Sequence, residues 1–160
     1  MSDEQGRDIT VSRVLDASPE RVWRAMTVPQ ALSHWWGPRG CTATVQTMDL
    51  RPGGAWIYRM NVYGLTSFHN HSVFTEVVEH ERIVYTNGSG KEGHGASDFE
   101  SALLLQAEGG GSQTNVTFRI VFATPFFRDQ FARKYSAVDG GRQTLERLAG
   151  YLAETAATEA

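Results

Sequence analysis

Two histidines are the residues in this chain whose type and spacing could do chemistry. His69 and His71 lie two positions apart in Thr66 to Val78, a segment with the residue types of a β-strand. Side chains two residues apart on a strand point to the same face, so the two imidazoles act as a pair. Val73 and Val77 share that face. If the apolar face of the strand is the inner one, both histidines point into the interior.

Such a pair could support several roles. Imidazole changes charge near neutral pH, so His69 and His71 are candidate catalytic bases. With a third ligand the pair could bind a metal ion; His34, His94 and Glu100 are candidates, and their spacing singles out none of them. Of the functional roles we favour hydrogen bonding to a bound ligand, without a metal or another cofactor. The structural alternative is a polar pair at the rim of the strand.

Other motifs for nucleophilic or phosphate chemistry are missing from the sequence. The single cysteine, Cys41, has Arg39 as its only local cation in the sequence. We therefore interpret it as an ordinary small residue and not as a catalytic thiolate. No Gly-x-Ser-x-Gly motif occurs, and the glycine-rich segments 88–90 and 109–111 lie between expected strands without a following helix. Phosphate-loop and dinucleotide-binding functions are therefore excluded.

The elements that must position these residues are mostly strands joined by short turns, which predicts an antiparallel sheet in an α+β domain. The expected strands cover residues 9–16, 42–48, 55–62, 66–78, 82–86, 100–107 and 114–123. Ser18, Pro19 and Glu20 are typical of a helix start, and a second short helix is expected from Pro29 to Trp35. The segment Asn87 to Ser97 has four glycines and no periodicity, so we expect a loop.

The last long segment, Phe126 to Leu152, predicts a helix about 40 Å long that crosses the whole domain. Apolar residues recur there at steps of three, four or seven: Phe127, Phe131, Tyr135, Val138, Leu145, Leu148 and Leu152. Gly140 and Gly141 interrupt the pattern, and glycine costs roughly 1 kcal/mol relative to alanine within a helix. Either the helix breaks at this pair or the missing side chains leave space.

Composition favours one soluble domain. The chain has 160 residues, 41% of them hydrophobic, and a net charge of -3 without a run of lysine and arginine, which argues against nucleic-acid binding. We expect a domain over residues 9–154 between tails at 1–8 and 155–160. The polar start lacks a signal-peptide pattern and no apolar run is long enough for a membrane span, so we expect a cytoplasmic protein. Composition leaves a homodimer open.

Several motifs resemble one family over nearly the full length of the chain. They are Ala17-Ser18-Pro19-Glu20-Arg21-Val22-Trp23, Trp35-Trp36-Gly37-Pro38, Asp49-Leu50-Arg51-Pro52-Gly53-Gly54, Glu76-Val77-Val78, Glu81-Arg82-Ile83-Val84-Tyr85-Thr86 and Gln143-Thr144-Leu145-Glu146-Arg147-Leu148. In this order they look like the START-related (SRPBCC) superfamily, and within it the single-domain bacterial homologues of the heat shock protein 90 ATPase activator. The resemblance implies a helix-grip fold: a curved antiparallel sheet of six to seven strands around a long C-terminal helix, with two short helices after the first strand.

One departure from the family bears on the interior. The family usually has Gly-Trp before the Gln-Thr-Leu stretch of the last helix, where this chain has Gly140-Gly141. A tryptophan buries on the order of 200 Å² of surface. Its loss enlarges the cavity between helix and sheet unless a neighbour such as Phe131 or Tyr135 fills the space.

The resemblance and the aromatic residues together predict that a small hydrophobic or aromatic molecule, such as a lipid or a polyketide, binds between helix and sheet. The candidate ligand-binding residues are Trp36, Trp56, Tyr58, Met60, His69, His71, Phe118, Phe131, Tyr135 and Gly141. We expect Gly64 and the 88–97 loop to open and close the entrance. One alternative is a polyketide cyclase or dehydratase with a cavity histidine as base. Another, implied by the family alone, is a chaperone partner, although the eukaryotic activators carry an additional domain that this chain lacks.

Overall fold

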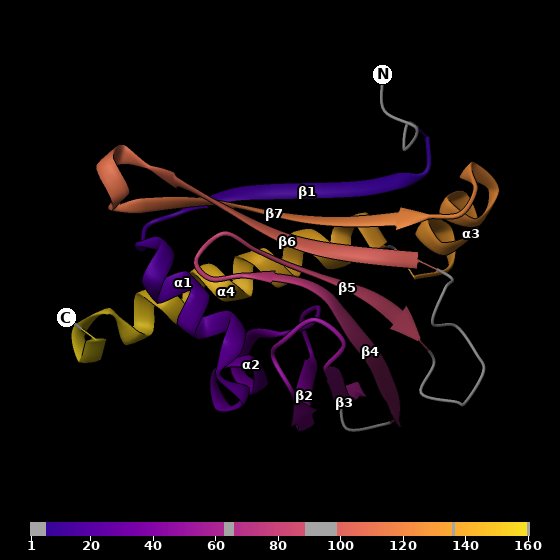
Figure 1. The fold of residues 1–160 in the computed structure, drawn as a ribbon, viewed down its shortest axis with the longest axis horizontal. Coiled ribbons are helices and arrows are strands. Elements are labelled where there is room, and N and C mark those ends of the chain that lie inside the picture. Colours follow the sequence, from indigo (N-terminus) through magenta and orange to yellow (C-terminus); the bar gives the residue numbers. More distant parts are fainter. Residues whose placement is uncertain (1–5, 63–65, 89–98, 136, 160) are drawn as a thin grey trace.

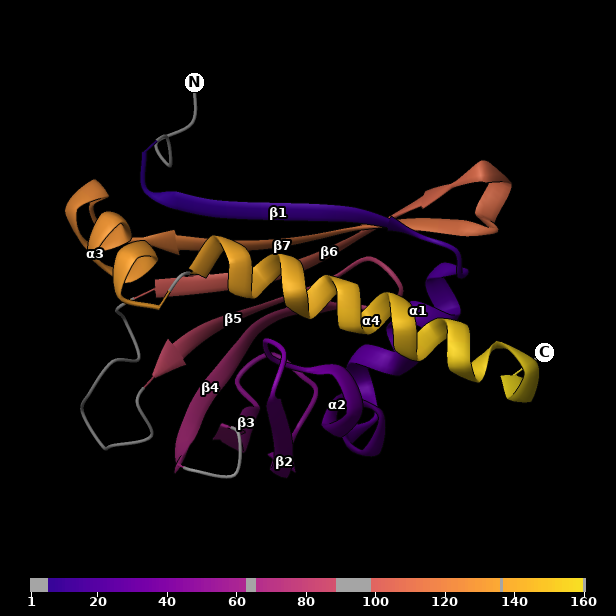
Figure 2. The same cartoon turned by 180° about the vertical axis from the view of Figure 1, so that it is seen from behind.

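The chain folds into a single antiparallel sheet that curls around the last helix (Figures 1 and 2). We describe a computed structural model, which covers residues 6–62, 66–88, 99–135 and 137–159. The seven strands lie in the order β1-β7-β6-β5-β4-β3-β2. Their bounds are β1 Asp8–Leu15, β2 Cys41–Met48, β3 Ala55–Val62, β4 Thr66–Val78, β5 Arg82–Gly88, β6 Phe99–Glu108 and β7 Gln113–Phe122. The predicted fold class, a helix-grip α+β domain, is confirmed.

The helices are α1 Pro19–Thr27, α2 Pro29–Trp35, α3 Pro125–Tyr135 and α4 Ala137–Glu159, with a short 3₁₀ turn η1 at Gly109–Gly111. Three of the helices, α1, α2 and α4, lie on the concave side of the sheet, and α3 lies at one end of it (Figure 2). Ser18 caps α1 as predicted, since its hydroxyl oxygen accepts a hydrogen bond from the backbone N–H of Arg21 at 3.3 Å. α1 and α2 follow the edge strand β1 and pack beside α4, so the first and last parts of the chain meet.

The predicted single C-terminal helix is two helices in the structure. α3 ends at Tyr135 and α4 begins at Ala137, so the glycine pair lies inside the first turns of α4 and does not break it. α4 also continues to Glu159, past the domain end that we expected at residue 154. Phe127, predicted on the buried face, is 52% exposed because α3 lies at the end of the sheet beyond its concave face (Figure 2). The apolar spacing after position 140 does match α4, where Leu145, Leu148 and Leu152 are buried.

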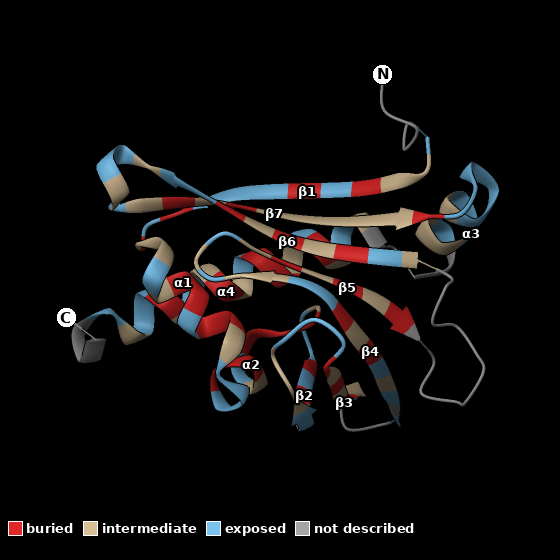
Figure 3. Cartoon of the chain, viewed as in Figure 1, coloured by how far each residue is buried: buried red, intermediate tan, exposed pale blue. Residues whose placement is uncertain are grey.

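Large aromatic side chains form the core between α4 and the sheet. Figure 3 shows the buried residues gathered where sheet and helices meet. Trp36, just after α2, is central: its ring lies 5.3 Å from Trp56 on β3 and 5.7 Å from Phe118 on β7, measured between ring centres. Trp56 in turn stacks on Phe74 of β4 at 5.8 Å. These rings bury large apolar areas and connect α2 to strands on both halves of the sheet.

Candidate ligand-binding cavity

A cavity of about 220 Å³ lies between the helices and the inner face of the sheet. Its wall combines five strands, both C-terminal helices and the turn after α2. The residues that line it are Trp36, Gly37, Pro38, Tyr58, Met60, Asn70, Tyr85, Asn87, Phe99, Ser101, Phe118, Ile120, Phe131, Gly140, Gly141 and Thr144. The cavity therefore lies where the sequence places a ligand, between the last helix and the sheet.

Many residues predicted to bind a ligand are brought together there. Trp36, Tyr58, Met60, Phe118, Phe131 and Gly141 all line the cavity. Trp56 does not line it: its ring is buried behind the wall, 5.0 Å from Tyr58 and 5.1 Å from Tyr85. The side chain of Tyr135 and the 88–97 loop beyond Gly88 lie outside the described residues, as does Gly64.

The prediction that His69 and His71 point inward is wrong, and a β-bulge explains the error. Both side chains are exposed on the outer face of β4. Val77 does pack against the core, as the predicted face requires. However, the register between β4 and β5 shifts just after Phe74, which is fully buried only three residues before Val77. Because one inserted residue reverses the alternation, Asn70 lines the cavity in place of its histidine neighbours.

The outward histidines have surface contacts. His69 Nε2 lies 3.4 Å from a guanidinium nitrogen of Arg59 on the neighbouring strand β3. Of the proposed third metal ligands, His94 lies outside the described residues. His34 belongs to α2, not to β4, and its ring stacks on that of Tyr151 of α4, with ring centres 5.7 Å apart. Within the described part of the chain, no three His, Cys, Asp or Glu side chains are arranged to hold a metal ion.

Sequence reasoning missed the polar part of the cavity wall. Asn70, Tyr85, Asn87, Ser101 and Thr144 all contribute to it. Asn87 is 9% exposed, and its carboxamide oxygen accepts a hydrogen bond from the Ser101 hydroxyl at 2.6 Å. A usable signal existed in β5 and β6: Tyr85 and Asn87 follow Ile83 at steps of two, and Ser101 precedes Leu103 by two, so these polar residues share the inner face with apolar ones.

Burial keeps the two cavity tyrosines neutral. Loss of water around the phenol raises the pKa of Tyr58 to about 12, although a hydrogen bond with Trp36 acts in the opposite direction. Burial likewise raises the pKa of Tyr85 well above its ordinary value, and the nearby Tyr58 adds to this effect. Cys41, close by on β2, also has a raised thiol pKa through burial, against the charge of Arg147, so it remains a thiol.

The space opposite Gly141 is closed by a strand. A Cβ atom built on Gly141 would lie 2.9 Å from Cγ2 of Val11 on β1 and 3.9 Å from Phe118. The glycine therefore lets α4 approach the sheet. Val11 occupies the space for which we expected either an enlarged cavity or an aromatic neighbour. Phe131 packs elsewhere, on Phe99 at 5.2 Å.

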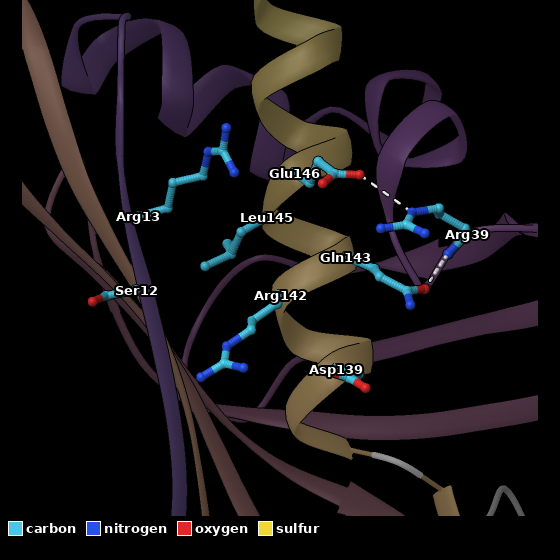
Figure 4. A pocket seen from close by; sticks show the side chains of 8 residues that line it. All are labelled: Ser12, Arg13, Arg39, Asp139, Arg142, Gln143, Leu145 and Glu146. Carbon is cyan, nitrogen blue, oxygen red and sulfur yellow. Dashed lines mark hydrogen bonds and ion pairs between the residues drawn. The ribbon is translucent and has the colours of Figure 1, made fainter.

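A second hollow, of about 630 Å³, lies on the other side of α4 (Figure 4). Its charged side chains are exposed, and several join the turn after α2 to the helix. The Arg39 backbone N–H donates to Gln143 Oε1 at 3.1 Å, and the Arg39 guanidinium pairs with Glu146 at 3.2 Å. Figure 4 shows Arg13 from β1 and Arg142 from α4 on the side of the helix that faces β1, across α4 from Arg39. The contacts in this groove are those of helix packing, so we place the candidate site in the largely apolar cavity between α4 and the sheet.

Solved structures share this arrangement. A crystal structure of a protein from Nitrosomonas europaea superposes with a TM-score of 0.83 at 23% identity, covering 98% of this chain and 99% of that chain. A solution structure from Arthrobacter aurescens gives 0.82 at 22% identity, covering 96% and 90%. An AHSA1-like protein from Aeromonas hydrophila gives 0.70 at 19% identity, covering 93% and 94%. At these identities the likeness establishes the fold.

The sequence itself matches a family model. A search of curated proteins gave no significant match. In the described part of the chain, no helix is both long and apolar enough to cross a membrane. The model named "Activator of Hsp90 ATPase homolog 1-like protein" matches residues 16–153, which include all the described strands except β1. The chain therefore belongs to this family, whose fold commonly binds hydrophobic ligands.

Proposed function

We propose that this protein binds a small, uncharged, largely aromatic molecule in the cavity between α4 and the sheet. The observation that carries the proposal is the lining of that cavity. Aromatic and apolar side chains such as Trp36, Phe118 and Phe131 form one part of it, and neutral polar groups form the rest. Apolar walls with a few convergent polar groups are typical of small-molecule sites.

The volume supports a ligand of about two fused rings. Sites for drug-sized ligands enclose roughly 300–1,000 Å³. The cavity here measures about 220 Å³, which is below that range. A sterol or a long acyl chain would require α4 to move away from the sheet, against the close contact between Gly141 and Val11. Among the hydrophobic ligands that the fold accommodates, the geometry therefore favours small planar ones.

The lining also supports a neutral ligand. None of the described lining residues is an acid, a lysine, an arginine or a histidine. Burying an unpaired charge costs far more than burying a hydrogen-bonded neutral group, so a carboxylate would lose affinity here.

The same lining favours binding over acid–base catalysis. A cyclase or dehydratase of the kind we considered would need a base with a pKa near neutrality beside the substrate. His69 and His71, the candidates for that role, are exposed on the outer face, and the pKa of each cavity tyrosine is raised. The family's description refers to activation of the Hsp90 ATPase, an activity on which the lining of the cavity has no bearing.

Thermal unfolding with matched probes tests the proposal. We compare 2-naphthol with its charged analogue 2-naphthoate, and include a sterol as the size comparison. A ligand present at 100 times its dissociation constant stabilises by about 2.7 kcal/mol, which raises the melting temperature of a chain of this size by about 5 to 10 °C. We expect this shift for the neutral bicyclic probe alone.

A cavity-filling variant locates the binding. Ile120→Trp fills the cavity from β7 and should abolish the shift. Val121→Trp makes the same substitution one residue later, on the outer face of the strand, and should leave the shift intact. Equal shifts with both variants, or a larger shift for 2-naphthoate than for 2-naphthol, would show that the probe binds elsewhere.

A further inference from the structure

A row of polar side chains crosses the inner face of the sheet at one end of the cavity. Trp56 on β3 is paired directly with Ser72 on β4, and Ser72 is paired with Asn87 on β5. All three are inner-face residues, and their exposed fractions are 2%, 1% and 9%. Directly paired residues on one face have Cβ atoms about 5 Å apart, so the three side chains are neighbours.

Each residue in this row has a hydrogen-bonding atom that lacks a partner in the described part of the chain. Trp56 Nε1 and Ser72 Oγ are fully buried without one. Asn87 uses its carboxamide oxygen for the Ser101 hydroxyl, at 2.6 Å, while its NH₂ group has no hydrogen bond within the described residues and, at the cavity wall, is not fully buried. Buried polar groups are normally hydrogen-bonded, because an unpaired one costs about 1–3 kcal/mol. Two neighbouring exceptions, next to an amide group that faces the cavity without a partner, therefore indicate a missing acceptor.

The chemistry of the three groups restricts that partner. An indole N–H and a carboxamide NH₂ only donate hydrogen bonds, and a serine hydroxyl can also donate. The complementary group is therefore an acceptor. Among the described residues that line the cavity none is cationic, so a neutral acceptor suits the row better than a carboxylate. A carbonyl oxygen, with two lone pairs, can accept from two of these donors at once.

We infer that the ligand carries a carbonyl oxygen, as in an aromatic ketone or lactone, and that this oxygen accepts a hydrogen bond from the NH₂ group of Asn87, where the row reaches the cavity wall. The inference rests on the proposed function, since it assigns the polar end of the molecule that the cavity holds. Asn87 lines the cavity and meets the oxygen first. Ser72 and Trp56 follow it along the row, behind the aromatic wall made by Tyr58 and Tyr85.

Two probes of the same shape test this inference by isothermal titration. In 2-acetylnaphthalene the side group has a carbonyl oxygen, and in 2-isopropenylnaphthalene a methylene group takes its place. One or two hydrogen bonds in a buried site correspond to roughly tenfold in affinity, so we expect the ketone to bind about tenfold more tightly. Asn87→Leu should reduce this preference towards one, and Ser72→Ala, which removes a buried hydroxyl behind the cavity wall, should retain it. His71→Ala, which changes the outer face of the same strand, is the matched control and should retain it.

The carboxamide in the row gives a readout that needs no substitution. The side-chain NH₂ resonances of Asn87, which lines the cavity, should move downfield with the ketone and stay in place with the alkene. Trp35 Nε1 already donates to the Ala25 carbonyl at 3.0 Å, so its resonance serves as the internal reference.

The outcomes separate the inference from the proposed function. Equal affinity for the two probes would overturn the carbonyl assignment while cavity binding stands, and the row would then hold ordered water only. A ketone preference that survives Asn87→Leu would also overturn it, because the oxygen would bind elsewhere. If neither probe binds, the proposed function fails and the inference fails with it.

Discussion

At the scale of single residues, the cavity depends on groups that are polar but uncharged. Tyr58 and Tyr85 are 5% and 1% exposed, and both keep their protons because a phenolate in this surrounding would lose its hydration. Asn87 and Ser101 satisfy each other in part through their 2.6 Å hydrogen bond. The interior thus offers hydrogen bonds without offering charge, and this property has consequences that can be measured in the free protein.

The first prediction concerns alkaline pH. Since the pKa of Tyr58 is raised from 10 to about 12, the folded state holds this proton more tightly than the unfolded state. The stabilisation is fully present below pH 10 and is lost as the pH rises towards 12, at about 1.4 kcal/mol per pH unit. We expect the free energy of unfolding in urea to fall steeply in this window, and less steeply in Tyr58→Phe. Parallel slopes for the two proteins would contradict a shifted Tyr58.

The second prediction concerns the glycine pair in α4. Gly141→Ala places a Cβ 2.9 Å from Val11, so we expect it to destabilise by about 1–3 kcal/mol despite the better helix propensity of alanine. Gly140→Ala meets only Pro38 at an ordinary 3.5 Å, and Gly150→Ala meets nothing within 4 Å. Both controls should be neutral or stabilising by up to about 1 kcal/mol. Chemical denaturation of the three variants checks the order, and Gly141→Ala as stable as the controls would refute the close approach.

At the scale of elements, the position of α4 is fixed by contacts with the turn after α2. The Arg147 guanidinium donates to the carbonyl oxygens of Gly37 and Pro38, each at 3.0 Å, and to that of His34 at 3.0 Å. These carbonyls lie at and beyond the C-terminal end of α2, where backbone acceptors lack helical partners and a positive charge is favourable. Because Gly37 and Pro38 also line the cavity, the same arginine shapes its mouth.

The third prediction tests this clamp. Arg147→Met keeps most of the apolar stem and removes three charge-assisted hydrogen bonds, so we expect a loss of about 2–3 kcal/mol in stability. Glu146→Gln, one residue earlier, breaks the Arg39 pair, whose side chains are 63% and 53% exposed, and should cost at most about 0.5 kcal/mol. Thermal unfolding of the two variants gives the comparison. An equal effect of both substitutions would show that the clamp contributes little.

The strands and helices also show which features of the fold could be predicted from the sequence and which could not. Turn residues and alternation predicted β3 and β4 with the bounds that the structure has, because local chemistry determines where a strand begins and ends. The bulge after Phe74 could not be read from alternation, since Val73 and Val77 suggest an uninterrupted face. One extra residue then placed His69 and His71 on the wrong side. Likewise, the glycine pair showed that a side chain was missing, and only the packing shows that Val11 takes its place.

At the scale of the whole molecule, the cavity belongs to no single element. Its wall takes residues from β3 to β7, from α3 and α4, and from the turn after α2. A bound molecule therefore contacts segments from Trp36 to Thr144 and stabilises the native arrangement of nearly the whole domain. The family fold provides this enclosure, while the side chains on its inner face decide which molecule enters.

The last prediction follows from the lack of charged side chains among the described residues that line the cavity. The imidazoles of His69 and His71 lie on the outer face, and the cavity tyrosines titrate only in alkaline solution, so a neutral ligand should bind with the same affinity from about pH 5 to pH 8. Titration of 2-acetylnaphthalene across this range measures it, and His71→Ala should give the same flat profile. A histidine in contact with the ligand would instead change the affinity around pH 6.5, the ordinary imidazole pKa. A change in affinity near this pH would indicate an ionisable group in the cavity wall and would make acid–base catalysis a candidate function again. A flat profile would indicate that the ligand is recognised by shape and by neutral hydrogen bonds.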